Sequence, residues 1–189
     1  MIVKLNFFKF VGHHLDEFLS WDYHINHVQN KLASSNYGIN ISKNFLPLHI
    51  RLKLYNSLFK SHLEFGLLAW GNVSSSKLKG IINLQKKCVR NVANKKSLSH
   101  SDPLFASLKL LKFNDLFNYN CTLFMHKFAF GKQPQSFHDM FTPLGSNNRT
   151  GNYLIRNYKL KFFDQFPSAF LPKLCNNNCA YIRENDMLL

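Results

Sequence analysis

Residues 75–93, SSKLKGIINLQKKCVRNVA, decide how the chain folds, because they carry an apolar face at helical spacing. Apolar side chains recur there at steps that place them along one side of an α-helix. They are Leu78, Ile81, Ile82, Cys88, Val89 and Val92. The spacing predicts a helix from about Ser75 to Ala93 that packs this side against the rest of the chain.

The opposite side of the expected helix is basic. Between Glu64 and Asp102 the chain has no acidic residue but seven basic ones: Lys77, Lys79, Lys86, Lys87, Arg90, Lys95 and Lys96. Along the helix, steps of four, three, four and four residues connect a polar stripe: Lys79, Asn83, Lys86, Arg90 and Asn94. Long cationic side chains in such a row can follow a phosphate backbone. A solvated helix face is the alternative, and the missing counter-charges favour the phosphate contact.

The whole chain shares this imbalance of charge. Its 189 residues include 24 Lys and Arg against 10 Asp and Glu, a formal net charge of +14 at pH 7. A surplus of this size favours a polyanionic partner, because each cation near a phosphate releases condensed counterions. Nucleic acid is the leading candidate, ahead of an anionic membrane surface or an acidic protein.

Upstream of this segment, the sequence predicts a β element and two further helices. Short aromatic and β-branched runs within residues 3–19 predict a strand or hairpin, in which Gly12 allows a turn or a bulge. Ser20 is expected to cap a helix, and Pro47 to occupy the first position of the next one. The apolar stripe of the first helix is Trp21, Ile25, Val28 and Leu32, and that of the second is Leu48, Leu52, Tyr55, Phe59 and Leu63.

Downstream, the helical pattern continues and then fades. Asp102-Pro103 predicts a short helical turn, and Asn114 or Asp115 opens a longer helix that Gly131 closes. No clear periodicity follows Pro134. The expected fold is therefore mainly α, with a short N-terminal β element, a four- or five-helix bundle and an irregular C-terminal tail.

Metal-binding residues are not expected in this chain. His24 and His27 lie one helical turn apart, and Cys175-x3-Cys179 has a loosely zinc-like spacing. A structural zinc site needs four ligands close together, and no second pair has a convincing spacing. Asp16-Glu17 and Glu184-x-Asp186 are close acidic pairs, and Asp16 is favoured as a turn or cap acid rather than as a metal ligand.

Several aromatic, histidine and cysteine residues have a structural and a functional interpretation. Trp21 and Trp70 can stack on bases as aromatic residues do in single-strand binders, but core packing is favoured because both accompany apolar stripes. His13-His14 is expected at a polar edge, and Cys88 as a small buried residue.

Export or membrane insertion is not expected. Lys4 and Lys9 interrupt the apolar part of the first twelve residues, so these do not resemble a signal peptide. The longest uncharged stretch, Phe65 to Ser76, is too short and too polar to cross a bilayer. We therefore expect an intracellular protein with reduced thiols at Cys88, Cys121, Cys175 and Cys179.

A series of short phrases stands in a characteristic order between residues 9 and 143. The phrases are Lys9-Phe10-Val11-Gly12, Asp16, Leu19-Ser20-Trp21, His24-Ile25, Phe45-Leu46-Pro47, Leu54-Tyr55-Asn56-Ser57-Leu58, Ser61-His62-Leu63-Glu64-Phe65-Gly66, Trp70-Gly71, Leu84-Gln85-Lys86-Lys87-Cys88-Val89-Arg90, Pro103-Leu104-Phe105, Leu108, Asp115-Leu116 and Phe124-Met125. In this order and spacing they resemble the region after the catalytic palm in jockey- and CR1-like non-LTR retrotransposon reverse transcriptases.

The chain departs from that family in three places. Ser61 stands where the family usually has Pro, and the family's Trp-Asn-Ser-Leu-Pro ending is not recognisable, with Phe166 to Pro172 at best a decayed trace of it. Of a further family phrase, only Asn148-Arg149-Thr150 remains. A truncated or decaying element copy would explain these departures.

The resemblance implies a partial RNA-directed DNA polymerase: a β element continuing from a missing palm (residues 1–19), a helical thumb-like domain (20–132) and a poorly specified tail (133–189). It implies sequence-independent binding of an RNA/DNA template–primer duplex by its backbone. The residues expected to make this contact are Lys79, Lys86, Lys87, Arg90, Lys95 and Lys96. Missing palm and endonuclease domains of the parent polyprotein are the implied protein partners, and a ribonucleoprotein of cytoplasm and nucleus is the implied location.

Polymerisation by the chain alone is not expected. Nucleotidyl transfer needs carboxylates that hold two Mg²⁺ ions, and the chain has no Asp-Asp pair. We therefore expect no catalytic residue and no cofactor here, with Mg²⁺ implied only for the palm. The alternative is a non-functional or domesticated remnant, a basic helical scaffold with no nucleic-acid role.

Overall fold

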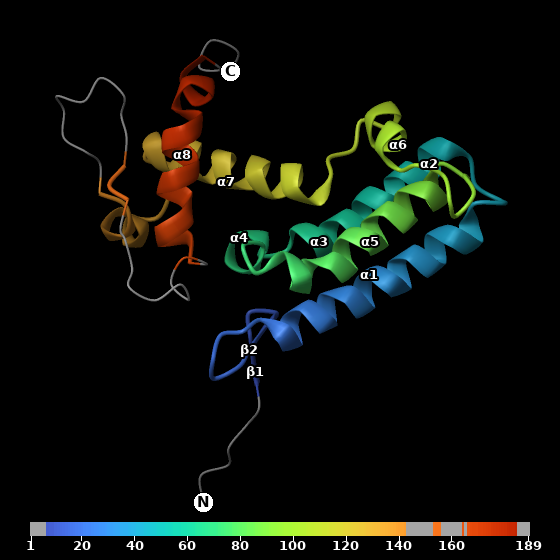
Figure 1. Cartoon of the computed structure of the whole chain (residues 1–189), viewed down its shortest axis with the longest axis horizontal. Coiled ribbons are helices and arrows are strands. Elements are labelled where there is room, and N and C mark those ends of the chain that lie inside the picture. The colour runs from blue at the N-terminus through green and yellow to red at the C-terminus, as the bar shows by residue number, and fades with distance from the viewer. Residues whose placement is uncertain (1–6, 143–152, 156–163, 165, 185–189) are drawn as a thin grey trace, which may run out of the picture. The chain divides into compact units, whose positions relative to one another are not determined.

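The computed structural model describes residues 7–142, 153–155, 164 and 166–184. These residues are mainly helical, with a two-stranded antiparallel sheet at the N-terminal side (Figure 1), which confirms the expected fold class. The chain divides into two compact units, Met1–Leu116 and Phe117–Leu189, and the division falls inside helix α7 (Phe113–Ala129). The division into residues 1–19, 20–132 and 133–189 rests on the resemblance and stays a prediction.

The N-terminal β element is a tight hairpin. Strands β1 (Phe8–Phe10) and β2 (His13–Leu15) pair antiparallel, with Phe8 opposite Leu15 and Phe10 opposite His13. Val11 and Gly12 between them both have positive φ, 44° and 82°. Such a two-residue turn matches the twist of the strands, and glycine adopts it without strain. The predicted hairpin and its turn at Gly12 are therefore confirmed.

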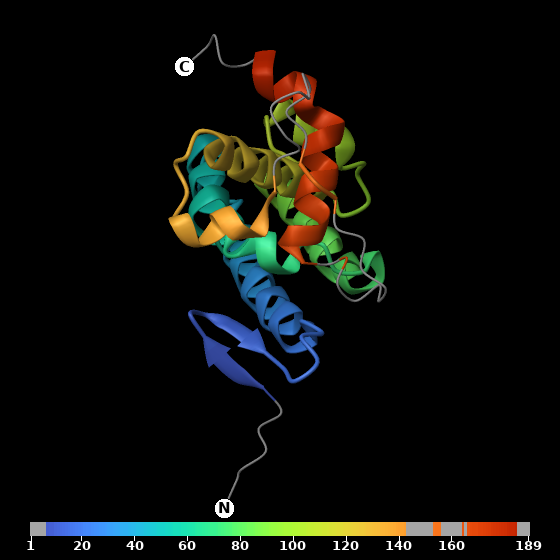
Figure 2. The same cartoon turned by 90° about the vertical axis from the view of Figure 1, so that its left-hand side faces the viewer.

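Helix α1 (Asp22–Ser42) begins next to this hairpin (Figure 1, Figure 2). Trp21, rather than Ser20, is its N-cap, and the Ile25 N–H donates to the Trp21 carbonyl at 2.8 Å. The Ser20 hydroxyl still accepts from the Asp22 N–H at the helix start, at 3.3 Å, while it donates to Oδ2 of buried Asp16 at 2.8 Å. The predicted hydrogen bond is therefore present, but the position of Ser20 is one residue before the N-cap. Asp16 also accepts from the Phe18 and Ser20 N–H groups, so it is the turn acid that the sequence favours.

One continuous helical stretch follows, made of α2 (Leu48–Leu54), a π-helical turn η1 (Tyr55–Lys60) and α3 (Ser61–Glu64). Pro47 is its N-cap, one residue before the predicted position. Tyr55, Phe59 and Leu63 are buried as the stripe predicts, because the wider π turn keeps residues four apart on one side. Leu48 was expected in the same stripe but is exposed. After Gly66 comes the short helix α4 (Leu67–Trp70).

Helix α5 (Ser75–Val92) packs along α1 (Figure 1). The predicted inward residues are buried except Ile82, which is half-buried. The two helices approach closely at Gly80, where an added Cβ would lie 2.6 Å from the Gln29 amide nitrogen. A buried hydrogen bond from Asn91 Nδ2 to Asn36 Oδ1, 2.8 Å long, joins them further along. Helix α6 (Asp102–Ser107) is the helical turn predicted at Asp102-Pro103.

Both tryptophans belong to the core of the first unit. Trp21 is 8% exposed and Trp70 is fully buried, and Trp70 Nε1 donates to the Phe65 carbonyl at 3.0 Å. Core packing of both residues is thereby confirmed, and neither ring is available to stack on a base.

The second unit contains most of α7, a 3₁₀ turn η2 (Gln135–Met140) and helix α8 (Pro167–Glu184). Its core is aromatic: the Phe117 and Phe170 rings lie 5.5 Å apart, and those of Phe128 and Phe141 5.0 Å apart. The sequence pattern did not predict α8, because Pro172 and the Asn176-Asn177-Asn178 patch both disfavour a helix interior. Asn148-Arg149-Thr150 and Asp186 lie outside the described residues, as does the side chain of Cys179.

Candidate nucleic-acid interface

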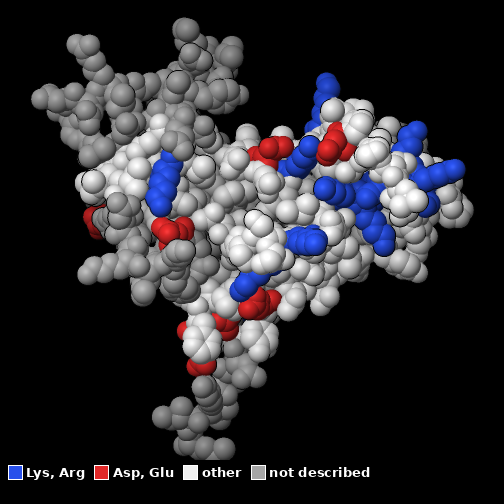
Figure 3. Space-filling model, in the orientation of Figure 1, with Lys and Arg blue, Asp and Glu red and all other residues white. Residues whose placement is uncertain are grey.

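Five of the predicted contact residues form a lysine surface on the first unit: Lys79, Lys86 and Lys87 on α5, and Lys95 and Lys96 in the turn after it. Their side chains are exposed except that of Lys86, which is half-buried. α5 buries its apolar side against α1, so its lysines are left on the outer side. Figure 3 shows Lys and Arg gathered over the end of this unit where α2, α6 and the end of α5 lie.

The last two lysines lie in the turn that ends α5. Asn94 has a positive φ of 51°, and its N–H donates to the Asn91 carbonyl at 3.1 Å. The Lys95 N–H donates to the Arg90 carbonyl at 2.9 Å, which completes a Schellman motif. With a rise of 1.5 Å per residue, Lys79 and Lys95 are separated by about 24 Å along the axis.

Arg90 supports the loop that follows α5. Its Nε donates to the Ser97 carbonyl at 3.0 Å, so the guanidinium holds the loop that carries Lys95 and Lys96. Its Nη1 is buried and has no hydrogen-bond partner among the described residues. The structure therefore places Arg90 as a support of the lysine surface. Whether it also contacts a phosphate stays a prediction.

The lysine surface lacks acidic partners. Among the described residues, none of its five lysines forms an ion pair with an Asp or Glu. Lys77 does not belong to it, because its Nζ lies 2.6 Å from Asp22 Oδ1 and donates to the Ser20 carbonyl. At the edge of the surface, Lys112 pairs with Asp102 at 3.0 Å. The hydrogen bond and the charge of Lys112 lower the pKa of Asp102.

Two basic residues near this surface were missed by the sequence analysis. Lys112 lies across a pocket from Lys86, but no helical periodicity connects it to α5. Arg51 of α2 is buried and donates from Nη1 to the Asn91 carbonyl at 3.4 Å, near the C-terminus of α5. A cation there complements the negative end of the helix dipole. No local signal in the sequence identifies either contact.

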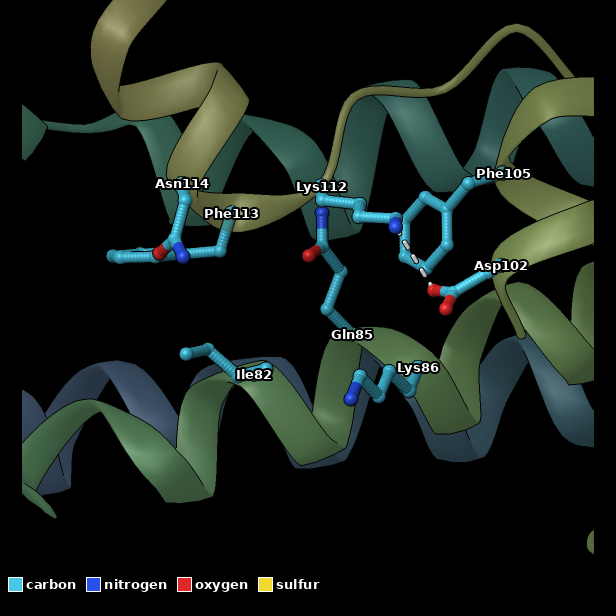
Figure 4. A pocket seen from close by; sticks show the side chains of 8 residues that line it. All are labelled: Ile82, Gln85, Lys86, Asp102, Phe105, Lys112, Phe113 and Asn114. Atoms are coloured by element: carbon cyan, nitrogen blue, oxygen red, sulfur yellow. Dashed lines mark ion pairs between the residues drawn. The ribbon is translucent and has the colours of Figure 1, made fainter. Parts of the chain in front are cut away.

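The pocket beside the lysine surface has a volume of about 230 Å³ and lies between α5, α6 and the start of α7 (Figure 4). Its lining residues are Ile82, Gln85, Lys86, Asp102, Phe105, Lys112, Phe113 and Asn114. Gln85 is 1% exposed, and its Nε2 donates to Tyr55 Oη at 3.2 Å and to the Leu111 carbonyl at 3.0 Å. Burial raises the pKa of Tyr55 to about 12, so its phenol stays protonated.

A histidine cluster occupies the junction of the hairpin and α1: His13, His14, His24 and His27. His24 is 1% exposed, and its Nε2 lies 3.4 Å from His13 Nδ1. Burial, followed by the positive charge of the other three histidines, lowers the pKa of His24 to about 4. His13 and His14 are half-buried rather than at a polar edge, because they pack onto α1 and Phe65.

Metal-ligand geometry is not present among the described residues, where no group of three or more His, Cys, Asp or Glu could hold an ion. Cys88 is buried, as the sequence predicts, and burial raises the pKa of its thiol well above the usual range. Within the described part of the chain, no helix is long and apolar enough to cross a membrane.

Comparison with known proteins gives no match for the chain among family models, curated proteins or solved structures.

Proposed function

We propose that this chain is a helical module that holds a template–primer duplex by its sugar–phosphate backbone, in the manner of a reverse-transcriptase thumb. The observation that carries the proposal is the lysine surface: five lysines along one helix and its C-terminal turn, without an ion pair to any described acid. Such cations are not paired with any acid in the described part of the chain, so a polyanion would gain most by binding there.

The spacing of the lysine surface suits a duplex backbone. About 24 Å along the helix corresponds to roughly seven base-pair steps at 3.4 Å per step of one strand. Lysine acts as a flexible point charge, whereas base readout relies on bidentate groups such as those of arginine, asparagine and glutamine. The contact is therefore expected to be independent of sequence.

The proposal assigns no catalytic residue and no cofactor to this chain. The proposal assigns polymerisation, with its Mg²⁺ ions, to a palm domain elsewhere in the parent polyprotein. The same polyprotein would also contain an endonuclease domain. On this proposal, the chain works inside cells as part of a retroelement ribonucleoprotein.

Fluorescence anisotropy with labelled 20-base-pair RNA–DNA hybrids tests the proposal. The wild-type chain should bind two unrelated sequences with affinities that agree within about twofold, because backbone contacts carry no sequence information. Lys86→Ala/Lys87→Ala should bind about 10- to 60-fold more weakly at 0.1 M salt, since each lost phosphate contact forgoes the release of about one counterion.

The matched control is Lys31→Ala/Lys43→Ala, which removes the same charge from α1 and the residue after it. It should bind nearly as well as the wild type. Equal losses in the two double variants would show that only net charge matters. A cooperatively folded chain that binds neither hybrid would instead support a scaffold without a nucleic-acid role.

A further inference from the structure

The pocket between α5, α6 and the start of α7 contains the side-chain oxygen of Gln85, a hydrogen-bond acceptor. The Leu111 carbonyl can only accept, so the nitrogen of the Gln85 carboxamide must face it. Nε2 also donates to Tyr55 Oη, which uses both of its hydrogens. Figure 4 shows the carboxamide oxygen on the side of Ile82 and Asn114, toward the open part of the pocket. No described residue donates to this oxygen.

The rest of the pocket has apolar side chains on its sides and charged ones, two lysines and Asp102, at its mouth. Phe105 and Phe113 are 3% and 2% exposed and form walls, together with half-buried Ile82. Lys86 and Lys112 lie at the rim, and Lys112 is paired with Asp102. A volume of about 230 Å³ is below the roughly 300–1,000 Å³ typical of sites for drug-sized molecules. The pocket is therefore suited to one small ring system next to an anionic group.

We propose that this pocket takes one unpaired nucleobase of the bound nucleic acid, with an exocyclic amino group donating to Gln85 Oε1. The flat faces of the base contact the apolar walls, and Lys86, which has no ion pair to a described acid, approaches the flanking phosphate. The pocket rests on the proposed function, because it adjoins the lysine surface and shares Lys86 with it. It adds a site for a single-stranded end or gap to a surface that otherwise holds a backbone.

Binding of labelled single-stranded oligonucleotides to the full chain tests the pocket. An eight-nucleotide deoxyadenosine strand is compared with an abasic strand that has the same phosphates. The deoxyadenosine strand should bind at least about 5-fold more tightly, the lower end of what base–aromatic contact contributes. A strand of deoxynebularine, whose base is unsubstituted purine, lacks the amino group. Its affinity should be about 3- to 10-fold lower than that of the deoxyadenosine strand, the effect of one hydrogen bond.

Ile82→Trp fills the pocket without changing charge and should bring deoxyadenosine binding down to the abasic level, with duplex binding unchanged. If Ile82→Trp loses helicity by circular dichroism, Asn114→Trp at the exposed rim replaces it. A preference for deoxyadenosine that persists in the filled variant, or no preference in the wild type, overturns the pocket and leaves the proposed function intact. If the wild-type chain does not bind the duplex, the proposed function itself is overturned.

Discussion

His24 links the stability of the first unit to pH. The side chain is 1% exposed, and its ring packs between Trp21 and Trp70 at centroid distances of 5.8 and 5.7 Å. The His14 N–H donates to its Nδ1 at 3.5 Å, so the neutral ring carries its proton on Nε2, next to His13. A second proton would place a charge in this buried cluster, where Lys9, Lys31 and His62 also lie close by.

The size of the effect follows from the pKa. Burial lowers the pKa of His24 from 6.5 to about 4 in the folded chain. Between these values the unfolded chain binds a proton that the folded chain does not, so stability is full above pH 6.5 and falls as pH decreases toward 4. The loss from His24 is roughly 2 kcal/mol at pH 5 and about 3 kcal/mol below pH 4. The pKa values of His13 and His27 are also lowered, which adds to the loss.

Urea unfolding at pH 7 and pH 5, followed by tryptophan fluorescence, measures this effect, because both tryptophans belong to the first unit. His24→Gln removes the titrating ring and should reduce the difference in unfolding free energy between the two pH values by roughly 2 kcal/mol. His49→Gln at an exposed position of α2 is the control and should leave that difference unchanged. An equal pH dependence in His24→Gln and the wild type would refute the assignment.

Three further predictions concern stability and reactivity. Gly66→Ala should destabilise the fold by about 1–2 kcal/mol or more, because φ is +60° and the new methyl would meet the His13 ring. Gly38→Ala, in open space on α1, should stabilise the fold by about 0.5–1 kcal/mol. Equal urea midpoints for the two variants would contradict this prediction. Asn91→Leu should lower the free energy of unfolding by about 1–3 kcal/mol, because Asn36 Oδ1 loses its donor. In a double-mutant cycle with Asn36→Leu the two losses of stability should be coupled, and additive losses would contradict the prediction. Because the Cys88 thiol is buried and its pKa is raised, it should not react with iodoacetamide in the native chain and should react after denaturation. Peptide mass spectrometry measures the labelling at this residue. Fast labelling of the native chain would contradict the burial of Cys88.

The elements that could be predicted from the sequence are those whose buried apolar residues lie close together along the chain. α1 and α5 follow from stripes at helical spacing, and the hairpin from aromatic runs on either side of Gly12. In each case burial of one face is the dominant free-energy term, and its periodicity is visible in a single segment. Lys79 and Lys86 were found for the same reason, since a buried face fixes the direction of the opposite one. Lys87, Lys95 and Lys96 were found because the stretch between Glu64 and Asp102 has no acidic residue.

Features that depend on distant partners could not be predicted. Gln85 and Asn91 resemble surface residues in sequence, but they are buried because Tyr55, Leu111 and Asn36 complete their hydrogen bonds. Lys77 forms an ion pair with Asp22, which lies far away along the chain. Ser20 lies one residue before the N-cap of α1, where its hydroxyl donates to Asp16 and accepts from the Asp22 N–H.

The salt dependence of duplex binding tests the central claim most directly. If the five lysines each contact a phosphate, the logarithm of the association constant should fall with the logarithm of salt concentration at a slope of about −4 to −5. Replacing Lys79, Lys86, Lys87, Lys95 and Lys96 together with Ala should bring the slope close to zero, while far-ultraviolet circular dichroism stays unchanged. A flat dependence in the wild type, or an unaltered slope in the folded fivefold variant, would contradict backbone binding by this surface.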